Sequence, residues 1–224
     1  MALTRELVAR SSRSVEDAGL SPGADYLTDP EYDVAVRDTL AQVPPEGLWL
    51  FAYGSLLWKP AFEFVESQAA VAQGWHRSFC IRIARFRGTP DQPGLMMTLD
   101  RGGQCRGVVF RIPAEQSEGK LHQLFRRELV VKDRPNIQRW LKVQTRHGPL
   151  IALGFVANQQ SKFYSGKLPL DEVAEVLSRA AGHWGSCAEY LRETVAHLEE
   201  RGIRDANLWR LQALVAERLK TMSD

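Results

Sequence analysis

Short apolar runs fill the middle of the chain. Residues 48–53 are all apolar or aromatic, which is typical of a strand buried on both faces. Residues 141–146 instead alternate apolar with polar, as in a half-buried strand. About six strands are expected, over residues 48–53, 78–84, 95–99, 105–112, 141–146 and 150–156. Arg101-Gly102-Gly103 is predicted to be a hairpin turn, and His147-Gly148 another.

Helical periodicity dominates the two ends of the chain. Asp29-Pro30 favours a helix start, with a capping side chain followed by proline, and Pro44-Pro45 ends that helix. Later helices are expected over residues 117–128, 171–182, 187–202 and 205–219, with Ser117, Ser186 and Asp205 at their starts.

The order of these elements predicts an α+β fold, a compact set of about six strands curled together with helices outside. Residues 1–46 are expected to be a helical N-terminal extension and residues 47–224 the main domain. No run of about 18 apolar residues occurs, and the N-terminus lacks the apolar core of a secretory signal, so a cytoplasmic protein is expected.

Three cysteines, Cys80, Cys105 and Cys187, lie far apart in the sequence. They form no CxxC motif or Cys/His cluster, so the sequence indicates neither a zinc site nor a disulfide framework. In a cytosolic protein they are expected to be buried or free thiols.

Charge is distributed unevenly along the 224 residues. Residues 1–46 hold four arginines and nine acidic residues, a net charge of −5, so the remainder carries +7 of the total of +2. His76, Arg77, Arg82, Arg85 and Arg87 form a basic strip in which no acid lies between Glu66 and Asp91. Such a strip fits either an anion- or nucleic-acid-binding surface or a solvated strand face. The aromatic residues in it lack an RNA-binding pattern.

Tyr53-Gly54-Ser55 interrupts an apolar run directly after the first strand. A glycine there lets the backbone turn sharply and lets a ligand approach it. The amides of Gly54, Ser55 and Leu56 then form a possible anion-binding cluster. The alternative is a plain turn with Tyr53 in the core.

Glu128 shares a helix face with Leu121, Leu124 and Phe125, and it is the only acid on that face. Burial raises the pKa of an inward carboxyl toward the range in which a general base works at neutral pH. The alternative is a Glu that is simply paired with an arginine.

Other catalytic motifs are missing from the sequence. No GxSxG, GxGxxG, Walker or HExxH pattern is present, and the five histidines have no metal-ligand spacing. Tyr164, in a loop rich in turn residues, suits either a pocket lining or a packing role.

The segment YGSLLW at residues 53–58 resembles the signature of the ChaC-type γ-glutamylcyclotransferases, which act on glutathione. Four further segments follow in the family's order and at about its spacing, so the resemblance covers residues 47–219. They are GTPDQPGLMMTLD (88–100), GGQCRGVVFRI (102–112), LFRRELV (124–130) and AAGHWGSCAEYL (180–191).

This resemblance implies a mixed β-barrel with flanking helices and a cofactor-free reaction in which glutathione gives 5-oxoproline and cysteinylglycine. It implies that Glu128 is the catalytic acid/base. It also implies that the γ-glutamyl end of the substrate is held by Leu50, Phe51, Ala52, Tyr53, Gly54 and Ser55.

The chain departs from some relatives in two places. Residues 129–132 read LVVK where some relatives have Gly-Gly-Tyr, and Gly94-Leu95-Met96 stands where some have Gly-Arg-Val. Because these positions are expected to bear on the peptide end of the substrate, a cyclotransferase for other γ-glutamyl amines or peptides stays open as an alternative. A second alternative is a non-catalytic γ-glutamyl-binding module, which would be free to lose Glu128.

Overall fold

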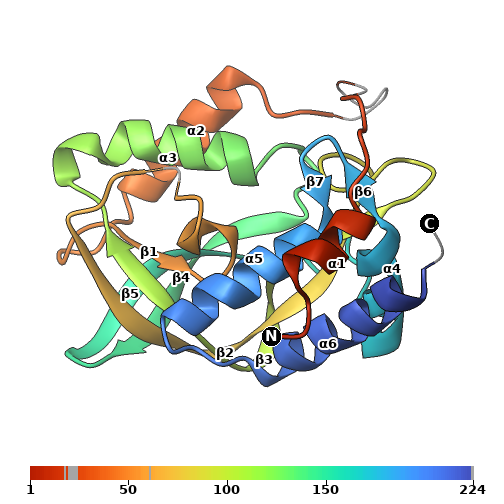
Figure 1. The fold of residues 1–224 in the computed structure, drawn as a ribbon. Helices are drawn as coiled ribbons and strands as arrows, with labels where there is room; N and C mark the ends of the chain where they lie inside the picture. The colour runs from red at the N-terminus through yellow and green to blue at the C-terminus, as the bar shows by residue number, and fades with distance from the viewer. Residues whose placement is uncertain (18, 20–24, 61, 223–224) are drawn as a thin grey trace. The chain divides into compact units, whose positions relative to one another are not determined.

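The computed structural model describes residues 1–17, 19, 25–60 and 62–222. Its helices are α1 (Arg5–Arg10), α2 (Asp29–Leu40), η1 (Ser55–Leu57), η2 (Ala114–Gln116), α3 (Ser117–Glu128), α4 (Leu170–Arg179), α5 (Cys187–Glu200) and α6 (Ala206–Thr221). Its strands are β1 (Trp49–Ala52), β2 (Glu66–Ile83), β3 (Gly94–Arg111), β4 (Asn136–Thr145), β5 (Gly148–Ala157), β6 (Ala181–Gly182) and β7 (Gly185–Ser186). Figure 1 labels most of them on the ribbon.

The chain divides into two compact units. Unit 1 contains residues 1–21, 78–97 and 163–224, and unit 2 contains residues 22–77 and 98–162. The long strands β2 and β3 contribute to both units. Residues 1–21 and 22–46 fall in different units, and the boundary expected at residue 46 stays a prediction.

Five strands close into a barrel in the order β1-β3-β2-β4-β5. Strand β1 pairs antiparallel with β3, where Leu50 lies opposite Phe110, and parallel with β5, where Leu50 lies opposite Leu153. All four residues of β1 are buried, because it has neighbours on both edges and side chains packed on both faces. The predicted α+β class and β-barrel are confirmed.

The strand boundaries differ from expectation in several places, and β4 also begins at Asn136, before the predicted residue 141. The predicted hairpin at Arg101-Gly102-Gly103 is wrong, since β3 runs without a break through it. Gly102 and Gly103 have φ angles of 103° and 66°, a left-handed backbone that such glycines allow in the middle of a strand. Strand β2 begins at Glu66, well before the predicted start at residue 78. The barrel therefore has five strands rather than about six, and the turn before β5 is confirmed.

The helix predictions are close, but several end residues differ. Thr28 is the N-cap of α2 in place of Asp29, because its amide and hydroxyl both donate to Glu31. Gln116, and not Ser117, occupies the N-cap position of α3. Helix α4 ends at Arg179, since residues 181 and 182 form β6. Ser186 and Asp205 cap α5 and α6 as predicted.

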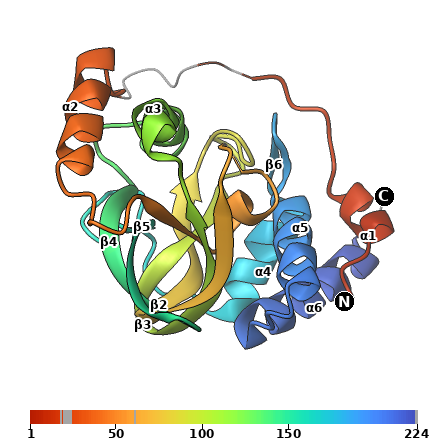
Figure 2. The ribbon, with the colours of Figure 1, turned by 90° about the vertical axis from the view of Figure 1, so that its left-hand side faces the viewer.

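Within unit 2, helix α3 lies beside α2 in both views (Figures 1 and 2). Phe125 of α3 packs edge-on against Phe155 of β5, with ring centroids 6.2 Å apart. The hydroxyl of Tyr32 in α2 donates to the carbonyl of Leu129, just after α3, at 2.9 Å. These contacts fix the C-terminal end of α3, where Glu128 lies, against both the barrel and α2.

Within unit 1, helices α4, α5 and α6 pack on one another, and α1 contacts α5 and α6. The three cysteines are buried free thiols, as expected. Burial raises the pKa of Cys187 to about 11, so its thiol stays protonated at neutral pH. No helix in the described part of the chain is long and apolar enough to cross a bilayer.

Candidate functional site

The Tyr-Gly-Ser corner, residues 53–55, leaves the C-terminal end of β1 inside unit 2. The Tyr53 ring lies in the core, and its hydroxyl donates to the carbonyl of Phe155 at 2.9 Å. Leu50, Phe51 and Ala52 are buried as well. A ligand at this corner would therefore meet main-chain groups rather than these four side chains.

The chain turns immediately after Tyr53. Residues 55–57 form the single 3₁₀ turn η1, closed by a hydrogen bond from the Leu57 amide to the Gly54 carbonyl at 2.9 Å. The amides of Ser55 and Leu56 open this turn, so they have no partner within it. The corner thus places main-chain amides that are not used within the turn at the end of a buried strand.

The buried side chain of Arg77 supports the corner through a hydrogen bond to its main chain. The side chain of Arg77 donates from Nε to the Tyr53 carbonyl at 2.7 Å and from Nη2 to the Arg106 carbonyl. Only 5% of Arg77 is exposed. The sequence placed Arg77 in a basic strip, whereas the structure places it in the core as a support for the corner.

Glu128 is the last residue of α3, on the face that also carries Leu121, Leu124 and Phe125. These three side chains are buried, and the Glu128 side chain is 16% exposed. Burial raises the pKa of Glu128, and the positive charge of Arg127 only partly offsets that rise. The predicted inward orientation is confirmed, and such a carboxyl suits proton transfer near neutral pH.

Arg127 connects Glu128 to the corner. Its Nη2 donates to the hydroxyl of Ser55 at 2.7 Å, and its Nε lies 3.2 Å from Oε1 of Glu128. Nη1 donates to the carbonyl of Lys59 at 2.7 Å. Glu128 and Ser55, 73 positions apart in the numbering, therefore share one guanidinium. Sequence reasoning missed this role; the one available signal was an arginine adjacent to an inward-facing Glu.

Three further members of the basic strip, His76, Arg85 and Arg87, are held by intramolecular contacts, whereas Arg82 is exposed. Arg85 forms two hydrogen bonds to Asp17, at 3.0 and 2.8 Å, which lower the pKa of Asp17 to about 2. Arg87 binds Glu189 at 2.7 Å, and His76 contacts the Gly102 carbonyl at 3.1 Å. Because these groups already have protein partners, the strip does not form a row of available charges.

Two further expectations concern residues near the ends of strands. Tyr164 is half-buried and its main chain forms an isolated β-bridge with Ile81, so whether its side chain lines a pocket or packs stays a prediction. Leu129, the first residue of the LVVK segment, is fully buried. Its side chain therefore supports the end of α3 and does not reach a ligand.

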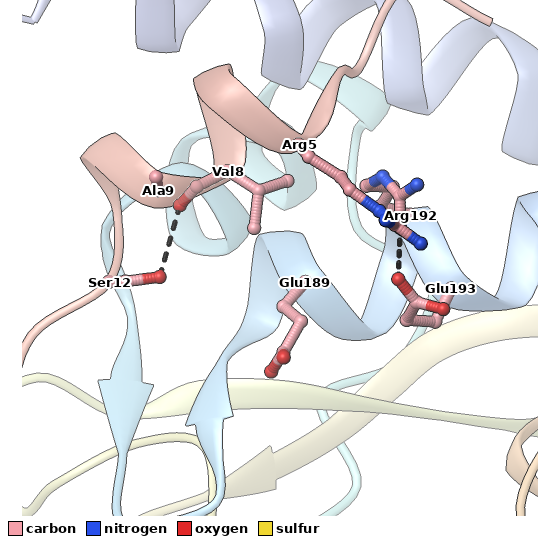
Figure 3. Close-up of a pocket in the computed structure, with 7 residues that line it drawn as sticks. All are labelled: Arg5, Val8, Ala9, Ser12, Glu189, Arg192 and Glu193. Atoms are coloured by element: carbon pink, nitrogen blue, oxygen red, sulfur yellow. Dashed lines mark hydrogen bonds and ion pairs between the residues drawn. The ribbon is translucent and has the colours of Figure 1, made fainter.

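Glu128 lines neither of two surface cavities. One, of about 300 Å³, is lined by residues of α1 and α5 in unit 1, among them Arg5, Glu189 and Arg192 (Figure 3). The other, of about 360 Å³, is lined by α2 residues together with Arg134 and Gln138. Among the described residues, no group of three or more His, Cys, Asp or Glu side chains is arranged to hold a metal ion.

Comparison with known proteins identifies the family. The family model described as "ChaC-like protein" matches residues 48–218. The glutathione-specific γ-glutamylcyclotransferase of Escherichia coli K12 is 36% identical over 172 residues, which cover 76% of this chain and 74% of that protein. Glutathione-specific γ-glutamylcyclotransferase 1 of the mouse is 35% identical over 150 residues, covering 66% and 67%.

A solved structure supports the fold. A yeast γ-glutamyl cyclotransferase described as specific to glutathione superposes with a TM-score of 0.70 at 21% identity, covering 76% of this chain and 96% of that one. The residues matched by the family model, 48–218, contain the barrel, the corner and α3. The chain therefore belongs to the ChaC-like family of γ-glutamylcyclotransferases.

Proposed function

We infer that this protein is a glutathione-specific γ-glutamylcyclotransferase, which converts glutathione to 5-oxoproline and cysteinylglycine. The observation that carries this inference is the match of this chain to bacterial and mouse enzymes of that name, over two thirds or more of those proteins' lengths. The inward-facing Glu128, joined through Arg127 to Ser55, supplies an acid/base group at the corner that the family resemblance marks as the binding segment.

The reaction is an intramolecular displacement. The α-amine of the γ-glutamyl group attacks the γ-carbonyl carbon, a five-membered ring forms, and the bond from that carbon to the cysteine nitrogen breaks. At neutral pH the α-amine is an ammonium and cannot attack until it loses a proton. The α-nitrogen loses a second proton as the ring closes. The cysteine nitrogen gains one proton before it leaves and another afterwards, when the amine of cysteinylglycine becomes an ammonium. No water, electron or cofactor enters the balance.

Glu128 suits both proton transfers. As a carboxylate it accepts the proton from the ammonium, and as the acid it returns that proton to the leaving nitrogen. Positioned acid–base catalysis of this kind contributes about 10²–10⁴-fold. The remaining acceleration comes from holding the flexible γ-glutamyl chain bent, so that nitrogen and carbon are in contact.

Substrate binding is proposed for Leu50, Phe51, Ala52, Tyr53, Gly54 and Ser55. The buried strand keeps the corner rigid, and the main-chain amides after Tyr53 suit a carboxylate or the carbonyl oxygen on which negative charge develops. The net charge of +7 on residues 47–224 also favours an anionic peptide. A cytoplasmic location is proposed because glutathione is abundant there.

The test is direct. The purified protein is incubated separately with glutathione, γ-Glu-Ala and γ-Glu-ε-Lys, and 5-oxoproline is measured. Release from glutathione alone is expected. Release mainly from one of the other two would replace glutathione with a different γ-glutamyl substrate. Release from none, with glutathione still bound, would instead support a binding module.

A further inference from the structure

The guanidinium of Arg127 uses all three of its nitrogens on three different groups. Nη1 binds the Lys59 carbonyl and Nη2 binds the Ser55 hydroxyl, each at 2.7 Å, while Nε lies 3.2 Å from the Glu128 carboxylate. The two ends of the turn after β1 are thereby tied to the last residue of α3.

We propose that Arg127 is a positioning residue for the cyclisation, holding the Glu128 carboxylate at a fixed place relative to the Tyr-Gly-Ser corner. This inference rests on the proposed function, because it assigns a role within that reaction. Nothing in it requires Arg127 to touch the substrate.

A positioning residue is needed because the backbone alone does not fix the orientation of the Glu128 carboxylate. The end of α3 is well fixed, with the Leu129 amide donating to the Phe125 carbonyl at 2.7 Å. The Glu128 side chain nevertheless has three rotatable bonds beyond that backbone. A planar guanidinium with its other two nitrogens already bound to Ser55 and Lys59 offers the carboxylate one place to pair.

The positive charge of Arg127 also lowers the pKa of Glu128. Burial raises the pKa of Glu128, and Arg127 is the charged group that opposes the rise. The other charged residues of this region have different partners: Arg126 binds Asp29 at 2.8 Å, His122 lies 3.7 Å from Asp33, and Lys132 contacts Asp25 and Glu31. Loss of the Arg127 charge should therefore raise the Glu128 pKa further.

The neighbouring Arg126 provides a matched control. It is on the same turn of α3, but its side chain is 49% exposed and lies over the Tyr32 ring and against Asp29. Arg126→Gln removes the same charge one residue away without touching Glu128 or Ser55.

The experiment compares wild type, Arg127→Gln, Arg127→Lys and Arg126→Gln. We expect Arg127→Gln to lower kcat for 5-oxoproline release about 10- to 100-fold, the scale of a misplaced catalytic group. The acidic limb of its pH–rate profile should move to higher pH. Arg127→Lys keeps the positive charge but loses the planar guanidinium that binds three groups at once. The acidic limb of its pH–rate profile should therefore stay near that of wild type, while its kcat should recover only in part. Arg126→Gln should match wild type in both.

Thermal unfolding of each variant separates loss of fold from loss of positioning. The pKa of the Glu128 carboxyl, followed by carbon-13 NMR in wild type and Arg127→Gln, gives a readout that does not need turnover, and it should rise in the variant. An active wild type whose folded Arg127→Gln variant keeps both kcat and the acidic limb would overturn the inference. An inactive wild type would instead refute the proposed function.

Discussion

The buried side chain of Arg77 donates a hydrogen bond to the carbonyl oxygen of Tyr53 at 2.7 Å. A trans peptide is planar, and its C=O and N–H point in opposite directions. The bond to Arg77 therefore directs the amide of Gly54 away from Arg77. In this way one core arginine sets the direction of the first donor of the Tyr-Gly-Ser corner.

Arg77→Met should weaken both the fold and substrate binding. It leaves the carbonyls of Tyr53 and Arg106 without this donor, and each buried unpaired group costs about 1–3 kcal/mol. Urea unfolding should show lower stability, and KM for glutathione should rise because the Gly54 amide is released. Arg82→Met, an exposed position on the same strand, should change neither. An Arg77→Met variant with the wild-type KM would show that the corner does not need this support.

Glu128→Gln should nearly abolish turnover while the protein still folds and binds glutathione. The amide cannot take a proton from the substrate ammonium, so a loss of about 10²–10⁴-fold in kcat is expected. The measurement is the rate of 5-oxoproline release, with binding checked by calorimetry. Glu118→Gln is the matched control, since Glu118 lies exposed in the first turn of the same helix. Wild-type turnover by the Glu128→Gln variant would exclude Glu128 as the base.

The same substitution should stabilise the fold at neutral pH. The pKa of Glu128 is raised above its ordinary value of 4.5 by burial, so above pH 4.5 the native state keeps a proton that the unfolded chain releases. The free energy of unfolding of the wild type therefore falls as the pH rises from 4.5 through the raised pKa.

The Glu128→Gln variant does not lose stability with rising pH in this way, because glutamine does not ionise. Urea unfolding is measured at a series of pH values. The free energy of unfolding of the variant, relative to wild type, should increase between pH 4.5 and the raised pKa of Glu128 and stay constant above that pKa. Below pH 4.5 the difference should be flat. A variant that is less stable than wild type at pH 8 would mean that pairing with Arg127 outweighs the burial of Glu128.

Gly107 should not tolerate a side chain. A Cβ there would lie 2.4 Å from the carbonyl oxygen of Ala52 and 2.8 Å from the Phe51 ring. Gly107→Ala must push the strand that carries the corner, at a cost of about 1–3 kcal/mol. Gly119→Ala, in open space on α3, should instead stabilise by about 0.5–1 kcal/mol. Unfolding midpoints of the two variants test the contrast, and equal shifts would contradict it.

Much of the fold was predictable because its signals are local. The apolar run at residues 48–53 has the length and the pattern that are typical of a strand buried on both faces, and β1 lies within it. Leu121, Leu124, Phe125 and Glu128 are close on a helix whatever surrounds it, so the inward position of Glu128 followed from spacing alone. The hairpin prediction failed because its local signal had two meanings: Gly102-Gly103 bends a strand as readily as it closes a hairpin.

The sequence by itself determined the class of fold, the buried strand that leads into Tyr53 and the inward face that carries Glu128, because each depends on residues a few positions apart. Only the tertiary structure decided that Arg77 supports the Tyr53 carbonyl and that Arg127 joins Ser55 to Glu128. The physical reason is that these contacts cross between segments distant in sequence. The spacing of residues in the sequence does not show which distant group an arginine side chain will contact.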